Sequence, residues 1–80
     1  MRIDAAVQDR IMELCAENHM TLNKLASVCA MSQSTLNNIV SKRNKSTTVA
    51  TIQKICDGLE MTICDFFNTE TFRNIEQEIK

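Results

Sequence analysis

The stretch LNKLASVCAMSQSTLNNIVS, residues 22–41, decides the fold that this sequence predicts. Its apolar residues recur at helical spacing on both sides of a break at Ala30 and Met31, so we expect two short helices there. So short a connection favours helices that cross at a steep angle. The purpose of the second helix's outward face is the main question that the sequence raises. That face would carry only small amides and hydroxyls, namely Gln33, Ser34, Asn37, Asn38 and Ser41.

The composition indicates an all-α protein with one small domain. The chain has 80 residues, enough for a single core, and contains no Pro, one Gly, three Phe and no Tyr or Trp. A sheet protein would carry more turn and aromatic residues. No apolar run reaches the roughly 18 residues of a membrane helix, and the start MRIDAAVQDR lacks the apolar region of a signal peptide. We therefore expect a cytoplasmic protein with no membrane partner.

Caps and apolar spacing predict helices beyond this stretch. The first helix runs from about Asp4 to Asn18 on a stripe of Ile3, Val7, Ile11, Leu14 and Cys15. Three later starts share one pattern, in which a Thr or Ser N-cap follows Met and precedes Leu or Phe by four residues. This hydrophobic staple occurs in MTLNKL, MSQSTL and MTICDF, residues 20–25, 31–36 and 61–66.

The C-terminal part is predicted to contain two further helices and a tail. A helix within STTVATIQKICDGLE, residues 46–60, has Thr48 as its N-cap and Gly58 as a left-handed terminator. Its stripe is Val49, Ile52, Ile55, Cys56 and Leu59. A short helix follows from Thr62 to Phe67, and the tail could add a sixth helix on Phe72, Ile75 and Ile79. We expect a compact five-helix domain over residues 1–69 and a helical tail over residues 70–80.

The cysteines are predicted to be reduced core thiols. Cys15, Cys29, Cys56 and Cys64 lack close CxxC spacing, and each lies among apolar residues of a predicted helix. An alternative uses Cys15 and His19, four residues apart, as a nucleophile and its base, or with Cys29 around a metal ion. Because Cys15 continues an apolar stripe and a histidine near a helix C-terminus usually interacts with the dipole, we favour the core interpretation. We predict no metal and no cofactor.

Residues 22–41 have the features of a helix-turn-helix. The small side chain of Ala26 lets the two helices approach at their crossing. The residues that we expect to face the core are Leu22, Leu25 and Cys29 from the first helix and Leu36, Ile39 and Val40 from the second.

This motif resembles the phage repressor and Cro-like family of DNA-binding domains, also called XRE-type regulators. Counted from Leu22, the family has apolar residues at positions 4, 8, 15 and 18, Ala at position 5 and Gly at position 9. The chain fits five of these six positions with Leu25, Cys29, Leu36, Ile39 and Ala26. ICDGLEMTICDFF, residues 55–67, also resembles the end of the family's domain. The departure is Ala30, where the family's glycine adopts a left-handed conformation that costs alanine about 1–2 kcal/mol, so we expect a strained or shifted turn.

Charge is strongly segregated along the sequence, although the formal net charge is −1. From Asn18 to Cys56 there is no Asp or Glu, and this span has a net charge of +5 from Lys24, Lys42, Arg43, Lys45 and Lys54. Residues 1–17 carry −2 and residues 57–80 carry −4. Because phosphates repel acids, a basic span beside a polar face is typical of a duplex binder, whereas a merely solvated surface would mix both signs.

The resemblance implies a sequence-specific transcription regulator, a repressor, that binds double-stranded DNA and reads the major groove with the second helix of the motif. Amide side chains match the N6 and N7 edge of adenine, which would explain the polar face. By position, the base-reading residues would be Gln33, Ser34, Asn37 and Asn38. The phosphate-binding residues would be Thr21, Asn23, Ser32, Ser41, Lys42, Arg43, Asn44 and Lys45.

The family commonly doubles its half-site, which implies a homodimer. The tail residues Phe72, Ile75 and Ile79 are the candidate dimer contact, and the alternative is that Phe72 and Ile75 fold back on the core of their own monomer.

Two other classes of function are open. The fold could serve as a protein-interaction module, such as an antitoxin or a regulatory subunit that binds its partner through the acidic tail. An enzyme is the weakest interpretation, because the chain has no Gly-rich loop, no pair of histidines and no acid within the polar stretch to act as a base. No segment is large enough for a separate small-molecule domain.

Overall fold

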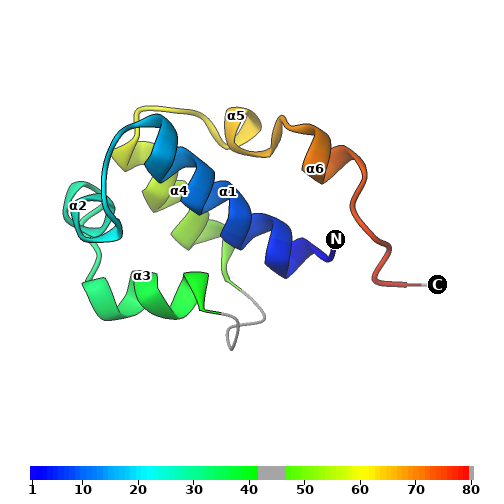
Figure 1. The fold of residues 1–80 in the computed structure, drawn as a ribbon, viewed down its shortest axis with the longest axis horizontal. Helices are drawn as coiled ribbons and strands as arrows, with labels where there is room; N and C mark the ends of the chain where they lie inside the picture. The colour runs from blue at the N-terminus through cyan, green and yellow to red at the C-terminus, as the bar shows by residue number, and fades with distance from the viewer. Residues whose placement is uncertain (42–46, 80) are drawn as a thin grey trace.

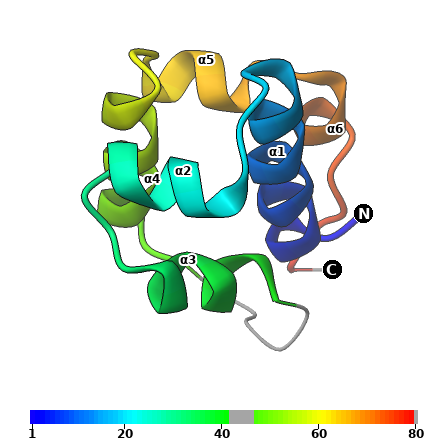
Figure 2. The same cartoon turned by 60° about the vertical axis from the view of Figure 1, so that its left-hand side comes forward.

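The protein folds as a set of short helices around one core. The computed structural model describes residues 1–41 and 47–79, and within them the chain forms six helices and no strand (Figure 1). They are α1 (Ile3–Glu17), α2 (Leu22–Val28), α3 (Gln33–Val40), α4 (Val49–Gly58), α5 (Ile63–Phe67) and α6 (Glu70–Arg73). Figure 2 shows α1 and α4 on either side of α2, with α3 below and α5 above. The all-α prediction is confirmed. None of the described helices has both the length and the apolar character that crossing a membrane requires.

The core is one cluster to which α1 to α5 contribute. Its members are Val7, Ile11, Leu14, Cys15, Leu25, Ala26, Cys29, Leu36, Ile39, Ile52, Ile55, Cys56 and Phe66. The predicted stripes are therefore confirmed in large part. They were wrong at Ile3 and Val49, whose side chains are 39% and 68% exposed. Each is the first residue of its helix, so its stripe extends past the end of the core.

Three connections of the described chain, residues 18–21, 29–32 and 59–62, share one geometry. The residue after each helix C-cap has a positive φ, 53° at His19, 55° at Ala30 and 56° at Glu60. The next residue is a methionine whose amide donates to a carbonyl five residues earlier, which is the Schellman motif. The hydrogen bonds measure 2.9–3.0 Å and join Met20 to Cys15, Met31 to Ala26 and Met61 to Cys56.

The same methionines precede the next helix, as the staple pattern predicted. The N-cap side chains of Thr21, Ser32 and Thr62 each accept a hydrogen bond from the amide three residues later. At α5 the side chain of Asp65 also accepts from the Thr62 amide, which completes a capping box. The methionines are partly buried against the core. Each one therefore closes one helix and begins the next.

Gly58 does not have the role that the sequence suggested. It does not adopt a positive φ; instead it is the last residue of α4, and Glu60 takes the left-handed conformation. The reason for a glycine here is space. A Cβ atom at this position would lie 2.4 Å from the Cys29 sulfur and 2.9 Å from the Val28 carbonyl oxygen. Gly58 therefore permits α4 to pack closely against the end of α2.

Arg10 of α1 holds α5 in place. Its side chain is only 11% exposed. The Nε atom donates to the Phe66 carbonyl over 2.7 Å, and Nη2 donates to the Asp65 carbonyl over 3.1 Å. These carbonyls belong to the last turn of α5, where backbone oxygens have no partner within the helix. The guanidinium also lies 5.9 Å from the Phe66 ring centroid and pairs with Glu13.

The tail does not form the long helix that the sequence suggested. α6 has four residues, and beyond it the Glu76 amide donates to the Met1 carbonyl over 3.1 Å. Arg2 and Glu78 form an ion pair over 3.1 Å. The backbone beyond α6 thus makes a hydrogen bond to the N-terminal segment in place of a further helical turn.

Phe72 folds back onto its own monomer, as the alternative interpretation proposed. Its ring centroid lies 4.8 Å from that of Phe67 and 6.2 Å from that of Phe66. Ile75 is half-buried, whereas Ile79 is 88% exposed. The three apolar residues of the tail therefore do not form one continuous exposed stripe.

Candidate nucleic-acid interface

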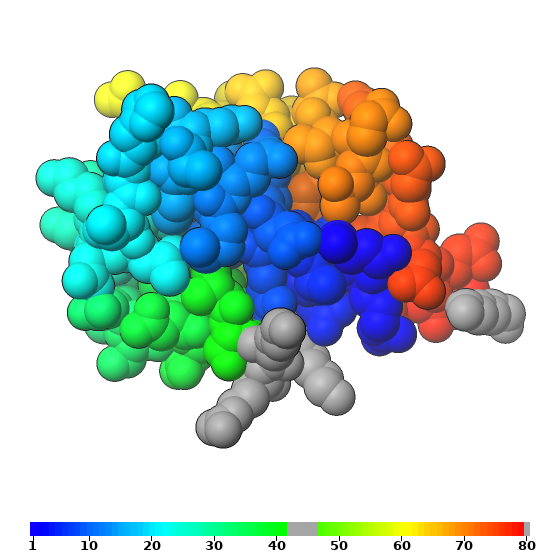
Figure 3. All heavy atoms as spheres, in the orientation of Figure 1, coloured from blue at the N-terminus to red at the C-terminus, as the bar shows by residue number. Residues whose placement is uncertain are grey.

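α3 has one buried and one exposed face. Leu36 and Ile39 are buried, Val40 is partly buried, and the helix packs against α1 and α2. Figure 3 shows α3, in green, along the lower edge of the molecule, away from the C-terminal residues. The four predicted base-reading residues, Gln33, Ser34, Asn37 and Asn38, are all exposed on this helix. The structure therefore brings them together on one surface.

The two ends of α3 are held by polar contacts. At its N-terminus the Ser32 hydroxyl accepts from the Thr35 amide over 3.1 Å and lies 2.7 Å from the Thr35 hydroxyl. At its C-terminus the side chain of Gln8, on α1, donates to the Ser41 carbonyl over 2.9 Å. The position of the polar face thus depends on α1 as well as on α2.

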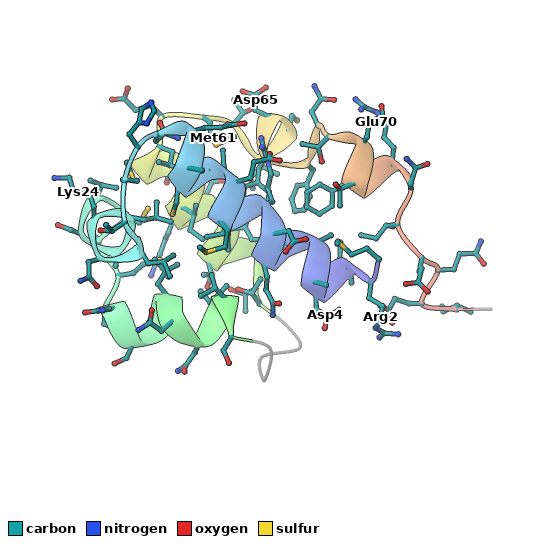
Figure 4. All side chains as sticks on the ribbon, viewed as in Figure 1. Arg2, Asp4, Lys24, Met61, Asp65 and Glu70 are labelled. Atoms are coloured by element: carbon teal, nitrogen blue, oxygen red, sulfur yellow. The ribbon has the colours of Figure 1, made fainter. Side chains whose placement is uncertain are left out.

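The start of α2 presents the other predicted phosphate contacts. Thr21 and Asn23 are exposed, and the Thr21 hydroxyl oxygen accepts from the Lys24 amide over 3.1 Å. Such a hydroxyl keeps its O–H proton for a second acceptor, for example a phosphate oxygen. In Figure 4 the Lys24 side chain points away from α2 into solvent. Four further predicted phosphate contacts, Lys42, Arg43, Asn44 and Lys45, lie outside the described residues.

The charges near the two helices favour an anion. Neither α2 nor α3 has an acidic residue in its first turn, so the partial positive charge of each helix N-terminus is not neutralised from within the helix. Figure 4 shows Asp65 and Glu70 at the edge of the molecule opposite α3. The sequence segregation of charge is thus also a segregation in space for these acids.

The sequence interpretation missed two residues of this region, Thr35 and Gln8. Thr35 is exposed on α3 and pairs with Ser32. The spacing of the two hydroxyls, three residues apart at a helix start, could have revealed this pair, since Thr48 and Thr51 repeat it. No sequence signal connects Gln8 with Ser41, because the two residues are 33 positions apart.

The structure does not place Cys15 and His19 together on a helix as a catalytic pair. Cys15 is buried in α1, whereas His19 is exposed on the connection that follows. Burial raises the pKa of the thiols of Cys15, Cys29 and Cys56, which disfavours the reactive thiolate. Within the described residues there is no group of three His, Cys, Asp or Glu side chains placed to hold a metal ion.

One cysteine does not belong to the core. The sequence analysis assigned all four cysteines there, but Cys64 is exposed. α5 has only five residues, of which Phe66 is the buried one, so this helix has little inward surface to offer a second side chain.

Comparison with known proteins agrees with this geometry. The model of the Cro/C1-type HTH DNA-binding domain matches residues 10–71. The chain belongs to this family. The chain is also similar to a crystal structure, that of the prophage Lp1 protein 11, with 30% sequence identity and a TM-score of 0.81. The match covers 94% of this chain and 100% of that one. A search of curated proteins gave no match. As a Cro/C1-type domain the chain binds double-stranded DNA, and the family resemblance seen in residues 22–41 and 55–67 is confirmed.

Proposed function

We propose that this protein is a sequence-specific transcription regulator, a repressor, that reads the DNA major groove with α3. The observation that supports it is the exposed row of Gln33, Ser34, Asn37 and Asn38 on a helix whose other face is buried. An amide donates and accepts at once, and so can pair with both N6 and N7 of adenine, while a serine hydroxyl suits several base edges. Repression follows most simply, because occupancy of a DNA site excludes other proteins from it.

We further propose two groups of phosphate contacts on either side of this helix. Thr21, Asn23 and Ser32 would contribute hydroxyls and an amide at the starts of α2 and α3. Ser41 and the segment Lys42, Arg43, Asn44 and Lys45 would follow the end of α3, and for these last four the proposal rests on their sequence alone. Contacts of this kind set the position of a protein on the duplex and carry no base information of their own.

Selection of binding sites from a random duplex pool, followed by substitution, tests the reading role. Gln33→Ala or Asn38→Ala should cost about 1–3 kcal/mol on the selected duplex, relax the preference at one base pair, and change binding to random DNA little. Gln53→Ala is a matched control, because Gln53 is exposed on α4 and bonds within its own helix. Equal weakening on both duplexes would exclude α3 as the reader.

Salt titration tests the phosphate contacts separately. Lys42→Ala, Arg43→Ala and Lys45→Ala should weaken all duplexes alike and lower the salt slope by about one each, since each cation releases one condensed counterion. Unchanged slopes in all three variants would remove this segment from the interface. If the wild-type protein bound no duplex even at low salt, the protein-interaction module would become the better proposal.

We also propose that two copies bind DNA as a symmetric homodimer. α3 has eight residues and a length of about 12 Å, so it can contact only a few base pairs. A second copy would double the site, with half-site centres about 10 base pairs apart. With Phe72 packed inside the monomer, residues 70–80 offer Ile75 and Ile79 as the dimer contact beyond the domain of residues 1–69.

Sedimentation on a selected palindromic duplex and on a single half-site checks this proposal. The expected stoichiometries are two copies on the palindrome and one on the half-site, and Ile79→Ser should weaken binding to the palindrome more than to the half-site. A single copy on the palindrome at saturation would refute the dimer. If the Ile79→Ser variant still bound the palindrome as two copies with unchanged affinity, the dimer contact would have to lie elsewhere in the molecule.

A further inference from the structure

The C-terminal end of α3 is built differently from the ends of α1, α2 and α4. The C-caps Asn18, Cys29 and Leu59 have ψ values of 6°, 5° and 4°, and a Schellman turn follows each of them. Ser41, the C-cap of α3, is extended, with φ −73° and ψ 143°. Ser41 therefore lacks the conformation that leads into a Schellman turn at the other three helices, and its carbonyl accepts a hydrogen bond from another part of the molecule.

Gln8 supplies such a contact from a rigid part of the fold. Its Nε2 atom donates to the Ser41 carbonyl over 2.9 Å, and the side chain is half-buried. The neighbouring α1 residues Val7 and Ile11 belong to the core cluster, so the backbone that carries Gln8 has little freedom to move. The hydrogen bond thus ties the end of α3 to the centre of the molecule.

We infer that Gln8 is a positioning residue for DNA reading, which rests on the proposed function of α3. Asn37 and Asn38 lie about one helical turn before Ser41. The hydrogen bond from Gln8 to Ser41 therefore fixes the position and orientation of their side chains relative to α1. Paired hydrogen bonds to a base edge tolerate displacements of only about 0.5 Å. Gln33, at the other end of α3, is held by the Ser32 cap instead. Loss of the tie should therefore affect the two ends of the reading face unequally.

Substitution Gln8→Met tests this inference, because methionine keeps the length of the side chain and removes the donor without a change of charge. Gln53→Met is the matched control on the exposed face of α4. Binding is measured well below the unfolding temperature on the selected duplex, on random DNA and on duplexes altered at single positions. We expect Gln8→Met to lose about 3- to 10-fold on the selected duplex and less than about 2-fold on random DNA, with an unchanged salt slope.

The pattern across base positions is the sharper measurement. In Gln8→Met the base preference should relax at the same base pairs as in Asn37→Ala and Asn38→Ala. It should persist at the base pair where Gln33→Ala relaxes it. Gln8→Lys restores a donor of similar reach and should recover the preference, even if Gln8→Met unfolds too readily to measure. Equal losses on selected and random DNA, equal relaxation at all positions, or no recovery with Gln8→Lys would overturn the positioning role. A wild-type protein with no preferred duplex would overturn the proposed function, and this inference with it.

Discussion

Ala30→Gly should make this protein more stable. Ala30 has a φ of 55°, a conformation that costs an L-residue with a Cβ atom about 1–2 kcal/mol. Glycine avoids this cost but gives the unfolded chain more freedom, which takes back about 0.5–1 kcal/mol. Ala30 is exposed, so the lost methyl group removes little apolar burial, and its amide can still donate to the Ser27 carbonyl. The midpoints of these two ranges leave an expected net gain of about 0.75 kcal/mol, or about 3–6 °C in Tm for a domain of this size.

Thermal unfolding followed by circular dichroism measures this gain. Ala16→Gly is the matched control, because Ala16 is an exposed alanine with helical geometry in the last turn of α1. The same change there should lower the stability by about 0.5–1 kcal/mol, since glycine is a poor helix former. The two substitutions are therefore expected to have opposite signs. If Ala30→Gly lowered Tm as much as Ala16→Gly, the argument from left-handed strain at the turn would be refuted.

Three further predictions concern the packing of the core and its thiols. Gly58→Ala should destabilise the fold by about 1–3 kcal/mol in urea unfolding, because the new methyl group would overlap the Cys29 sulfur, and an unchanged midpoint would contradict the close packing of α4 on α2. In the native protein an aromatic disulfide reagent should label one thiol rapidly, and Cys64→Ser should abolish that fast phase; rapid labelling of Cys15 would instead contradict its burial. Because burial raises the pKa of the three core thiols, they stay protonated after those of the unfolded chain ionise, so stability should fall as the pH rises above about 8.5. A urea midpoint that fell just as steeply with pH in Cys56→Ala as in the wild type would argue against a contribution from that thiol.

The parts of the fold that could be predicted from the sequence depend on close neighbours in the chain. The N-cap at Ser32 and the hydrophobic staple from Met31 to Leu36 each involve residues within five positions of one another, so both can be recognised from the local sequence. The exposure of Asn37 and Asn38 follows from the spacing of Leu36 and Ile39 in the same way. At Ala30 the resemblance to the family, whose glycine is left-handed at this position, implied a strained or a shifted turn, and the structure has the left-handed alanine.

The failures depend on partners far away in the sequence. A glycine near a helix end can permit either a left-handed turn or the close approach of another segment. At Gly58 the reason is the close approach of Cys29, which is 29 positions away in the sequence. The tail stops being helical after α6, and its backbone bonds to Met1 instead. In the interface, the sequence predicted the exposure of Gln33, Ser34, Asn37 and Asn38 but missed Thr35 on the same helix. Gln8 was missed because hydrogen bonding between helices leaves no periodic signal.

The four-residue connection between α2 and α3 also determines which way α3 faces around its own axis. Each of its four residues has a structural role. Cys29 is the C-cap of α2, Ala30 has the left-handed conformation, Met31 packs at the junction of both helices, and Ser32 is the N-cap of α3. A helix turns by about 100° per residue, so one inserted residue that α3 absorbed would rotate its whole surface by more than a quarter of a circle. Leu36 would then leave the core, and the amide row would turn away from the surface on which it is now exposed. The packing of Leu36 therefore fixes the length of this connection. Under the proposed function, a change of base preference would then require substitutions on the outward row.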